Sequence, residues 1–309
     1  MKAVRIHEYG DPGVLKYEDA PVPEIGPDEV LIKVHSAGVN PVDWKVRKGL
    51  LKERRPYRLP LIPGWDLSGT IERVGTLVTR LKEGDRVFSR PDIGRDGSYA
   101  EQIAVRADEV ALAPRSVPLE TAAGVPLCAL TAWMALFEWA GLRAGQTVLI
   151  HAASGGVGTF AVQLAKLAGA RVIGTTSGRN TEFVRSLGAD AVIDYRREDF
   201  STSVRDVDVV LDAVGGETRT KSLGVLRRGG VLSSIVGPVD PALARQHDVR
   251  AMGGLVAANG ARLQEIASLI DAGKLKVIIE KEFPLAEAMA AHELSETLRV
   301  RGKIILRVS

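Results

Sequence analysis

An apolar run at residues 147–151 passes through a turn of small residues into a segment with helical spacing at 159–168. The turn reads Ala153, Ser154, Gly155, Gly156, Val157 and Gly158. A buried strand that turns sharply into a helix is typical of a dinucleotide-binding unit, because glycines let the backbone approach a pyrophosphate at the helix N-terminus. The usual pattern is G-x-G-x-x-G, and Ala153 takes the place of its first glycine. A tight strand-to-helix turn without a ligand is the alternative interpretation.

Strand-like and helix-like segments alternate through the middle of the chain. Beyond the first strand, β-type runs lie at 171–176, 191–194, 207–213, 231–236 and 249–257. Helices are expected over about 131–140, 180–187, 216–228 and 261–272. This alternation predicts an α/β fold with a doubly wound parallel sheet.

The two ends of the chain have a different character. Short β-type runs at 30–34, 67–74 and 86–89 are separated by turn signals, which predicts a twisted antiparallel sheet or partial barrel. The tail returns to strands at 277–280 and 303–308 around a helix at 285–298. We therefore expect residues 1–118 and 271–309 to form one domain. The parallel-sheet domain, residues 119–270, is then inserted between them.

Composition excludes several classes of protein. A hydrophobic content of 45% and a charged content of 26% are ordinary for a globular protein. The 41 basic and 38 acidic residues are interspersed, which argues against a nucleic-acid-binding stripe. No run approaches the roughly 20 apolar residues that span a membrane, and the N-terminal sequence lacks a signal-peptide core, so we expect a cytoplasmic protein. Cys128 is the only cysteine, so a disulfide within the chain is impossible, and we expect a small buried residue.

The segment after the second predicted strand indicates which dinucleotide would bind. An NAD-specific site usually has an acidic residue there, on the ribose hydroxyls. This chain has Thr176, Ser177 and Arg179 instead, and hydroxyls with a guanidinium suit a 2′-phosphate. The pattern favours NADPH, with an exposed polar loop as the alternative. Tyr195, beside Asp194, could stack on adenine or bind the phosphate.

Two further turns follow the fourth and fifth strands of the predicted sheet. Ligands in such sheets bind beyond the carboxyl ends of the strands. We therefore expect Val214 and Val236 to line the cofactor, together with the residues of the glycine turn, Ser154, Gly155, Gly156, Val157 and Gly158.

Short motifs occur in a fixed order along the whole chain. They are GVNPVDWK at 38–45, PGWDLSG at 63–69, GSYAE at 97–101, LTAW at 130–133, LDAVGG at 211–216 and RGKIIL at 301–306. Together they resemble the medium-chain dehydrogenase/reductase superfamily, in its zinc-independent NADPH:quinone oxidoreductase and enone reductase branch. The resemblance implies a Rossmann sheet inserted into a mostly-β GroES-like partial-barrel catalytic domain.

Departures from the zinc enzymes of that superfamily are informative. The zinc alcohol dehydrogenases have a cysteine ligand where this chain has Asn40, and a histidine ligand where it has Trp65; their four-cysteine lobe is absent. Zinc needs three or four nitrogen, sulfur or oxygen ligands. With one cysteine and five scattered histidines, we expect no metal. Reduction of a quinone or an activated C=C bond is then favoured over oxidation of simple alcohols.

The resemblance also suggests roles for residues near the reacting atoms. It places Asn40 and Thr131 near the nicotinamide, although each could also cap a helix, Asn40 before Pro41 and Thr131 at the start of the 131–140 segment. Lys45 could stabilise the negative charge that develops on a carbonyl oxygen, or supply a proton. A solvated helix lysine, or one paired with Asp43 or Glu53, is the alternative.

Five more residues are candidates for the site, and most of them have a second interpretation. Arg301 and Lys303 match basic positions of the family that could reach the cofactor, but a surface strand carries such charges routinely. The aromatic residues Trp44, Trp65 and Tyr57 could shape a pocket, while core packing is the simpler interpretation of the tryptophans.

The sequence therefore predicts a zinc-independent, NADP(H)-dependent oxidoreductase that transfers hydride to a quinone or an α,β-unsaturated carbonyl, with Asn40 and Lys45 as catalytic residues. A non-catalytic NADPH-binding redox sensor and a zinc-free NADP-dependent alcohol dehydrogenase are the alternatives. The resemblance also implies a homodimer that pairs through residues 249–257.

Overall fold

The computed structural model describes residues 1–309, and the chain forms two compact units. Unit 1 comprises Met1–Leu127, Ala257–Gly273 and Val277–Ser309, and unit 2 comprises Cys128–Val256 with Lys274–Lys276. The limits of the inserted unit therefore fall at 128 and 256 rather than at 119 and 270.

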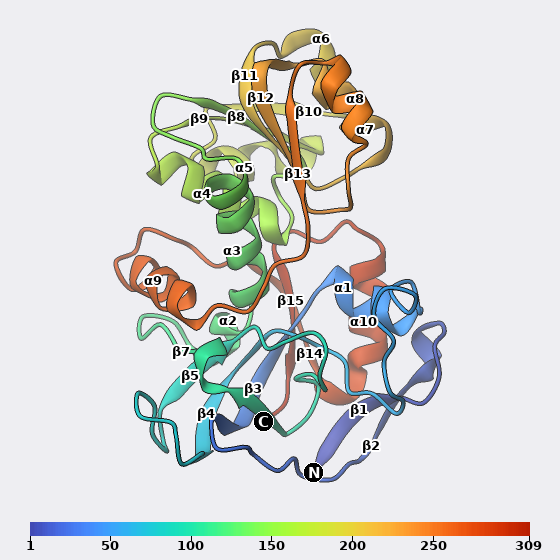
Figure 1. Ribbon diagram of the computed structural model, residues 1–309, viewed down its shortest axis with the longest axis vertical. Coiled ribbons are helices and arrows are strands. Elements are labelled where there is room, and N and C mark those ends of the chain that lie inside the picture. The colour runs from blue at the N-terminus through green and yellow to red at the C-terminus, as the bar shows by residue number, and fades with distance from the viewer. The chain divides into compact units, whose positions relative to one another are not determined.

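Helix α9 (Gly260–Asp271) explains most of that difference, because it packs on the β-rich unit (Figure 1). The side-chain oxygen Oε1 of Gln264 accepts a hydrogen bond of 3.1 Å from the backbone N–H of Leu112 in strand β7 (Val110–Leu112). Gly260 lies so close to the same strand that a Cβ atom there would be 2.6 Å from the carbonyl oxygen of Val110.

Unit 2 is built on a parallel sheet of six strands in the order β10-β9-β8-β11-β12-β13. The strands are β8 (Thr147–Ile150), β9 (Arg171–Thr176), β10 (Ala191–Asp194), β11 (Val207–Asp212), β12 (Leu226–Ser234) and β13 (Arg250–Gly253). In chain order this is 3-2-1-4-5-6, the doubly wound arrangement that the alternating pattern predicts. The strand order reverses between β8 and β11, and ligands bind at such a point in this class of fold.

Helices connect these strands, and two of them differ from the sequence prediction. The helices are α3 (Pro126–Trp133), α4 (Gly156–Leu167), α5 (Thr181–Ser186), α6 (Phe200–Ser203), α7 (Gly216–Leu223) and α8 (Pro241–Gln246). The helix predicted over 216–228 ends at Leu223, because Leu226 is buried in the apolar core and already begins β12. The helix predicted over 131–140 begins earlier, at Pro126, and continues as a π-helical segment, Met134–Trp139.

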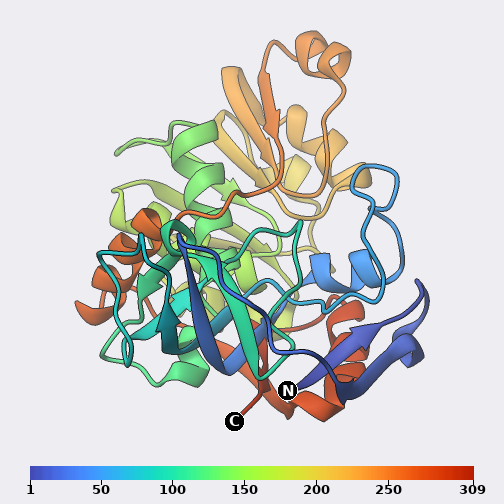
Figure 2. The ribbon, with the colours of Figure 1, turned by 60° about the horizontal axis from the view of Figure 1, so that its bottom comes forward.

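Unit 1 contains a sheet of seven strands and a separate two-stranded ribbon. Along the sheet lie β14 (Ile279–Pro284), β15 (Lys303–Arg307), β3 (Glu29–Val39), β4 (Leu67–Val74), β5 (Arg86–Ser89) and β7, and β6 (Gln102–Arg106) also pairs with β3. The ribbon is β1 (Lys2–Ile6) with β2 (Leu15–Asp19), dark blue in Figures 1 and 2. The short helices are α1 (Pro41–Arg47) and α2 (Leu119–Ala122), and α10 (Ala288–Glu296) follows β14.

The sheet is antiparallel except at the parallel pair β14–β15, so the prediction of an antiparallel sheet holds for its main part. Its inner face is apolar because every second residue of the central strands points into the core, as with Val30, Ile32 and Val34 of β3. Red strand β15 lies beside blue strand β3 although more than 260 residues separate them in the chain (Figure 1).

Strand register brings four polar residues to one end of this sheet. The register pairs are Ile304 with Val39, Ala37 with Leu67, and Leu67 with Ser89. Asn40 and Arg90 come directly after β3 and β5, while Asp66 precedes β4 and Lys303 opens β15. These four residues therefore lie at the same end of four neighbouring strands.

No helix of the chain combines the length and apolar character that crossing a membrane requires.

Candidate functional site

The glycine turn of unit 2 has the geometry that its sequence predicts. Strand β8 leads through Ala152, which has a φ of +50°, to Gly155, the N-cap of α4. A Cβ atom on Gly158 would lie 2.2 Å from the carbonyl oxygen of Ala152. Only glycine fits there, since the first turn of α4 packs directly against the strand end. The backbone N–H groups at the start of α4 are left to bind an anion.

The predicted 2′-phosphate residues gather next to this turn. Thr176 Oγ1 donates a hydrogen bond of 2.8 Å to Ser154 Oγ, and Asn180 Nδ2 donates one of 3.2 Å to the same oxygen. Ser177 follows β9 directly, and Arg179 is exposed in the single 3-10 turn Gly178–Asn180 that comes next. Hydroxyl groups and a guanidinium thus stand at the carboxyl ends of β8 and β9.

The other predicted cofactor residues of unit 2 lie at the same edge of the sheet. Tyr195 follows β10, is 57% exposed and donates its backbone N–H to Thr176 O at 3.1 Å. Val214 and Val236 follow β11 and β12. The acid of this edge, Asp194, accepts the backbone N–H of Arg196 at 3.1 Å.

Asp212, whose role the sequence analysis missed, shapes the turn that contains Val214. Its buried Oδ1 accepts backbone N–H groups from Val214 at 3.0 Å and Gly215 at 2.7 Å, and its Oδ2 accepts from Arg219 Nε at 2.7 Å. Burial alone would raise the pKa of Asp212, but the hydrogen bonds from Arg219 and the turn hold it below the ordinary value. The carboxylate therefore stays charged and fixes the loop.

His151 is a second residue that the analysis missed, directly after β8. It is buried, with Nδ1 3.0 Å from Thr175 Oγ1 and Nε2 2.9 Å from Ser222 Oγ. Burial lowers the pKa of His151 to about 4, so the ring is neutral at physiological pH. His151 therefore links the end of β8 to β9 and α7 by hydrogen bonds, and it adds no charge at the carboxyl ends of the strands.

In unit 1, a buried lysine organises the polar end of the sheet. The Lys303 ammonium is 3% exposed and donates to Val39 O at 3.0 Å, to Asp66 Oδ2 at 3.1 Å and to Asn40 Oδ1. Asn40 Nδ2 donates to Asp66 Oδ2 at 2.8 Å, so the amide of Asn40 has a defined orientation. Burial raises the pKa of Asp66, while the Lys303 charge opposes that rise. The interpretation of Lys303 as a surface residue is therefore wrong.

A second buried chain of hydrogen bonds supports the start of α1. Asp43 Oδ2 accepts the backbone N–H of Asn40 at 2.8 Å and the hydroxyl of Tyr99 at 2.9 Å. His292 Nε2 lies 3.2 Å from the Tyr99 oxygen, and its Nδ1 lies 3.1 Å from Arg47 Nη1. Burial lowers the pKa of His292 to about 3, so the neutral ring accepts from Arg47 and donates to Tyr99. Burial also raises the pKa of Asp43 to about 7.

Lys45 projects from α1 without a carboxylate partner. No ion pair joins it to Asp43 or Glu53, so the paired interpretation is wrong, while a solvated helix lysine remains the alternative. Its Nζ lies 5.6 Å from the centroid of the Trp44 ring, and partial burial lowers the pKa of the ammonium. Asn40 has the extended backbone of an N-cap, with Pro41 as the first helical residue, so the capping prediction is confirmed.

Comparison with known proteins identifies the family. Residues 26–115 match the family described as "Alcohol dehydrogenase GroES-like domain", and residues 187–306 match "Zinc-binding dehydrogenase". The chain is 37% identical to 2-methylene-furan-3-one reductase of Solanum lycopersicum over 99% of its length and 79% of the relative's. It is 36% identical to the chloroplastic NADPH-dependent alkenal/one oxidoreductase of Arabidopsis thaliana, over 99% of this chain and 79% of that protein.

Among solved structures, the quinone oxidoreductase of Coxiella burnetii superposes with a TM-score of 0.93. The two sequences are 37% identical, and the match covers 100% of this chain and 99% of that one. The chain belongs to the medium-chain dehydrogenase/reductase superfamily, in its quinone and enone oxidoreductase branch. The matches also confirm the fold class that the sequence predicts.

One of the matched families is described as zinc-binding. The polar residues around Lys303 at the end of the unit 1 sheet do not fit a zinc ion. Asn40 is bonded to a buried ammonium, and the indole Nε1 of Trp65 donates to Arg95 O at 3.2 Å. A cation and an indole donor are not zinc ligands. No three His, Cys, Asp or Glu side chains of the chain come together as a metal site.

Three further predicted site residues have structural surroundings that need no ligand. Thr131 lies inside α3 and is buried, so it is not the cap of that helix. Arg301 precedes β15, is half-exposed, and lies 3.5 Å from Glu280 as an ion pair. Trp65 is fully buried and packs with Ile6 and other core residues, which supports the core interpretation.

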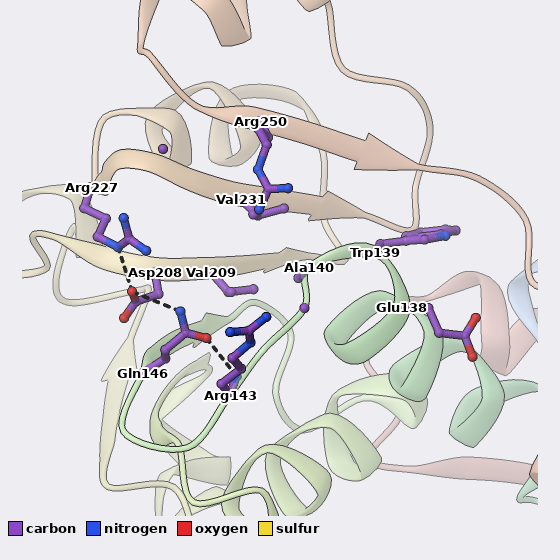
Figure 3. Close-up of a pocket in the computed structure, with 12 residues that line it drawn as sticks. Glu138, Trp139, Ala140, Arg143, Gln146, Asp208, Val209, Arg227, Val231 and Arg250 are labelled. Atoms are coloured by element: carbon purple, nitrogen blue, oxygen red, sulfur yellow. Dashed lines mark hydrogen bonds and ion pairs between the residues drawn. The ribbon is translucent and has the colours of Figure 1, made fainter.

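A cavity of about 350 Å³ lies elsewhere in unit 2, at the amino ends of the strands. Figure 3 shows Arg227 bonded to Asp208, with Arg143 and Arg250 reaching toward the cavity from a loop and from β13. Gln146 and Asp208, at the starts of β8 and β11, line it too. This is the opposite edge of the sheet from the glycine turn, so the cavity contains none of the predicted site residues.

Proposed function

We propose that the protein is an NADPH-dependent oxidoreductase that transfers hydride to a quinone or an α,β-unsaturated carbonyl without a zinc ion. The observation that carries the proposal is the nucleotide edge of unit 2, where a close-packed glycine turn stands beside hydroxyls and a guanidinium. The names of the two curated relatives point to the same chemistry, since one includes NADPH and alkenal/one substrates and the other a methylene-furanone.

NADPH fits this edge because its pyrophosphate and its 2′-phosphate each have suitable hydrogen-bond donors there. The N-terminus of α4 offers backbone N–H groups to the pyrophosphate, and the absence of a side chain at Gly158 lets the helix approach β8. Thr176, Ser177 and Arg179 suit the 2′-phosphate, since Arg forms charge-assisted bidentate bonds to phosphate oxygens. When bound, NADPH supplies the hydride.

On the acceptor side we assign Asn40 and Lys45 to the reaction. Hydride addition at the β-carbon of an enone leaves negative charge on the carbonyl oxygen, which a nearby cation stabilises. Lys45 has no ion pair that would neutralise it, and burial lowers its pKa, so it can both stabilise that charge and donate a proton. Asn40 offers an amide held in a fixed orientation by Lys303 and Asp66.

The zinc-independent assignment rests on the chemistry of the groups around Asn40. An internal ammonium among Val39 O, Asn40 and Asp66 supplies a positive charge of its own, and a divalent ion beside it would be repelled. Metal analysis of the purified protein tests this directly. A stoichiometric zinc content that activity depends on would contradict it.

The decisive experiment measures oxidation of NADPH, and separately of NADH, by purified protein with quinones, enones and alkenals. Fast turnover of one acceptor class that prefers NADPH supports the proposal and names the acceptor. Tight NADPH binding without turnover on any acceptor would favour a redox sensor instead. Oxidation of simple alcohols with NADP⁺ would favour an alcohol dehydrogenase.

A homodimer and a cytoplasmic location are further proposals. Strand β13 is the edge of the six-stranded sheet and exposes Met252, and an open edge can pair with the same strand of a second copy. Light scattering after size exclusion tests the dimer, and a monomer across micromolar concentrations would contradict it. Cell fractionation tests the location.

A further inference from the structure

Arg90 is a nearly buried cation without a protein partner. It follows β5 directly and is 4% exposed. Its Nε has no hydrogen-bond partner, and no ion pair of the chain includes it. Arginine in this state is rare, because charged side chains are almost never fully buried unless they are paired.

The carboxylates near Arg90 are engaged by other groups. Asp66, Asp92 and Glu109 act on its charge from a distance, and Arg55 opposes them. Asp66 is bonded to Lys303, and Glu109 Oε1 accepts from Arg106 Nη2 at 2.7 Å. Asp92 is half-exposed and lies 3.6 Å from the same Arg106 nitrogen. Burial lowers the pKa of Arg90, and the negative charges of these three carboxylates only partly offset that decrease.

The position of Arg90 links it to the predicted acceptor site. Leu67 pairs with Ser89, so Arg90 stands opposite Asp66, where β5 ends and β4 begins. Asp66 in turn accepts the side-chain N–H of Asn40 at 2.8 Å. Arg90 and the Asn40 amide that we assign to the reaction are thus two strands apart, with Asp66, at the start of the intervening strand β4, between them.

A second unpartnered polar group lies near Arg90. The hydroxyl of Tyr57 is buried without a hydrogen bond, and its ring centroid is 6.2 Å from that of Trp65. Burial raises the pKa of Tyr57 to about 12, and the Arg55 and Arg90 charges oppose that rise. The hydroxyl is therefore neutral and can donate a hydrogen bond, and the Arg90 charge acts on it electrostatically.

An unpaired buried charge destabilises the protein without a ligand. A ligand of opposite charge removes that cost, so the charge favours binding of such a ligand. Guanidinium groups match oxygen anions in charge and in hydrogen-bond geometry. We propose that Arg90 binds a negatively charged oxygen of the acceptor, with the Tyr57 hydroxyl as a second hydrogen-bond donor. This inference rests on the proposed function and adds Arg90 to it as the residue that binds the negatively charged oxygen of the acceptor.

Two sources of such an oxygen are chemically possible. One is a carboxylate on the acceptor, which would be charged before the reaction. The other is the carbonyl oxygen: as the hydride bonds to the β-carbon, the C=C electrons shift toward the carbonyl and the oxygen becomes an enolate, later neutralised by a proton at the α-carbon. A permanent anion mainly affects KM, whereas charge that develops in the transition state affects kcat.

The test uses matched acceptors and a matched control. The acceptors are 3-penten-2-one and 4-oxo-2-pentenoate, which differ by a methyl group replaced with a carboxylate. The variants are Arg90→Gln and Arg90→Met, with Arg86→Gln as the control, because Arg86 lies on the same strand but is exposed at its other end. Loss of one charge-assisted hydrogen bond corresponds to a change of about tenfold or more.

A rise in KM for the carboxylate acceptor alone supports the proposal with a carboxylate as the anion. A fall in kcat for both acceptors, with an unchanged KM for NADPH, supports it with the carbonyl oxygen. Kinetics of Arg90→Gln that match Arg86→Gln for both acceptors would overturn it.

Stability separates a binding role from a structural one. If Arg90 is retained for a ligand, Arg90→Met keeps or raises the unfolding temperature, because an uncompensated charge is removed. A lowered unfolding temperature would show that Arg90 supports the fold and would overturn the proposal.

A binding measurement distinguishes failure of this inference from failure of the proposed function. If wild type reduces neither acceptor class, the proposed function fails. Calorimetric titration with 4-oxopentanoate then decides about Arg90 alone. Binding by wild type that is lost in Arg90→Gln supports an anion site, and no binding by wild type overturns it.

Discussion

The Lys303→Met substitution tests the central ion pair of unit 1. The side chain that it removes donates to Val39 O, Asn40 Oδ1 and Asp66 Oδ2. Methionine has a similar length, so the change removes charge and hydrogen bonds with little change in volume. Asp66 would remain fully buried with the hydrogen bonds from Asn40 and from the backbone N–H of Leu127.

Removing one partner of a buried ion pair costs about 3–5 kcal/mol, because the other charge is left uncompensated. Domains unfold with only about 5–15 kcal/mol, so the loss is a large fraction of the stability. With a shift of about 2–4 °C per kcal/mol, the unfolding temperature should fall by roughly 6–20 °C.

The loss should also depend on pH in a defined direction. Burial already raises the pKa of Asp66, and Lys303 opposes the rise, so the variant raises it further. The folded state then binds a proton that the unfolded state releases at lower pH. Stability of the variant is therefore greatest below the ordinary aspartate pKa and is lost as pH rises through the raised folded pKa.

Urea denaturation at pH 5 and pH 8 measures both the stability loss and its pH dependence. The proteins compared are wild type, Lys303→Met, Asp66→Asn and the double variant. We expect the double variant to be more stable than Lys303→Met at pH 8 and to lose its extra pH dependence. Lys52→Met, at an exposed lysine without an ion pair, is the control and should change stability by about 0.5 kcal/mol or less. A Lys303→Met loss below about 1 kcal/mol, or no recovery in the double variant, would refute the reasoning.

Three further predictions concern chemistry and pH. Arg179→Ala should reduce the NADPH-to-NADH ratio of kcat/KM by about tenfold or more, with the NADH value retained; an unchanged ratio would remove Arg179 from the phosphate site. Lys45→Met should lower kcat by about a hundredfold with little change in the KM for NADPH, and a normal kcat would exclude Lys45 from the mechanism. Because the pKa of His151 is lowered to about 4 when folded, stability should fall by up to about 3 kcal/mol as pH drops from the ordinary histidine value of about 6.5 toward 4. His151→Gln should reduce that acid loss in urea titrations, and an identical pH profile would contradict the assignment.

Local sequence signals were sufficient for much of the fold. The strands predicted at 67–74, 86–89, 171–176 and 191–194 have the same limits in the structure, because turn residues or charges bound each of them. The helix predicted over 216–228 was too long, since helical spacing at its end is also compatible with the start of β12. Thr131 was misplaced for a similar reason, because the helix begins at Pro126, where proline is favourable in a first turn.

The candidate site was predictable only where its residues are close in sequence or share a sheet edge. Ser154 and Thr176 meet because the carboxyl ends of adjacent parallel strands meet, and the alternating pattern implies that adjacency. Burial of Lys303 depends on the register between β15 and β3, whose residues are 263 apart in the contact with Asn40. No local pattern specifies such a register, so Lys303 resembles a surface lysine in the sequence. The unpartnered state of Arg90 is likewise a property of the folded environment.

The ionisable groups at the end of the unit 1 sheet fall into two physical classes. Lys303 with Asp66, and Arg47 with His292, have their hydrogen bonds within the protein, so they hold geometry and need no ligand. Lys45 and Arg90 have no ion pair with a carboxylate, and burial lowers the pKa of both. A core selected only for stability would pair or replace a cation as buried as Arg90, because an unpaired buried charge lowers the free energy of unfolding. The paired groups therefore hold the geometry of the proposed site. The two unpaired cations supply a positive charge that we expect the acceptor to balance as it becomes negative.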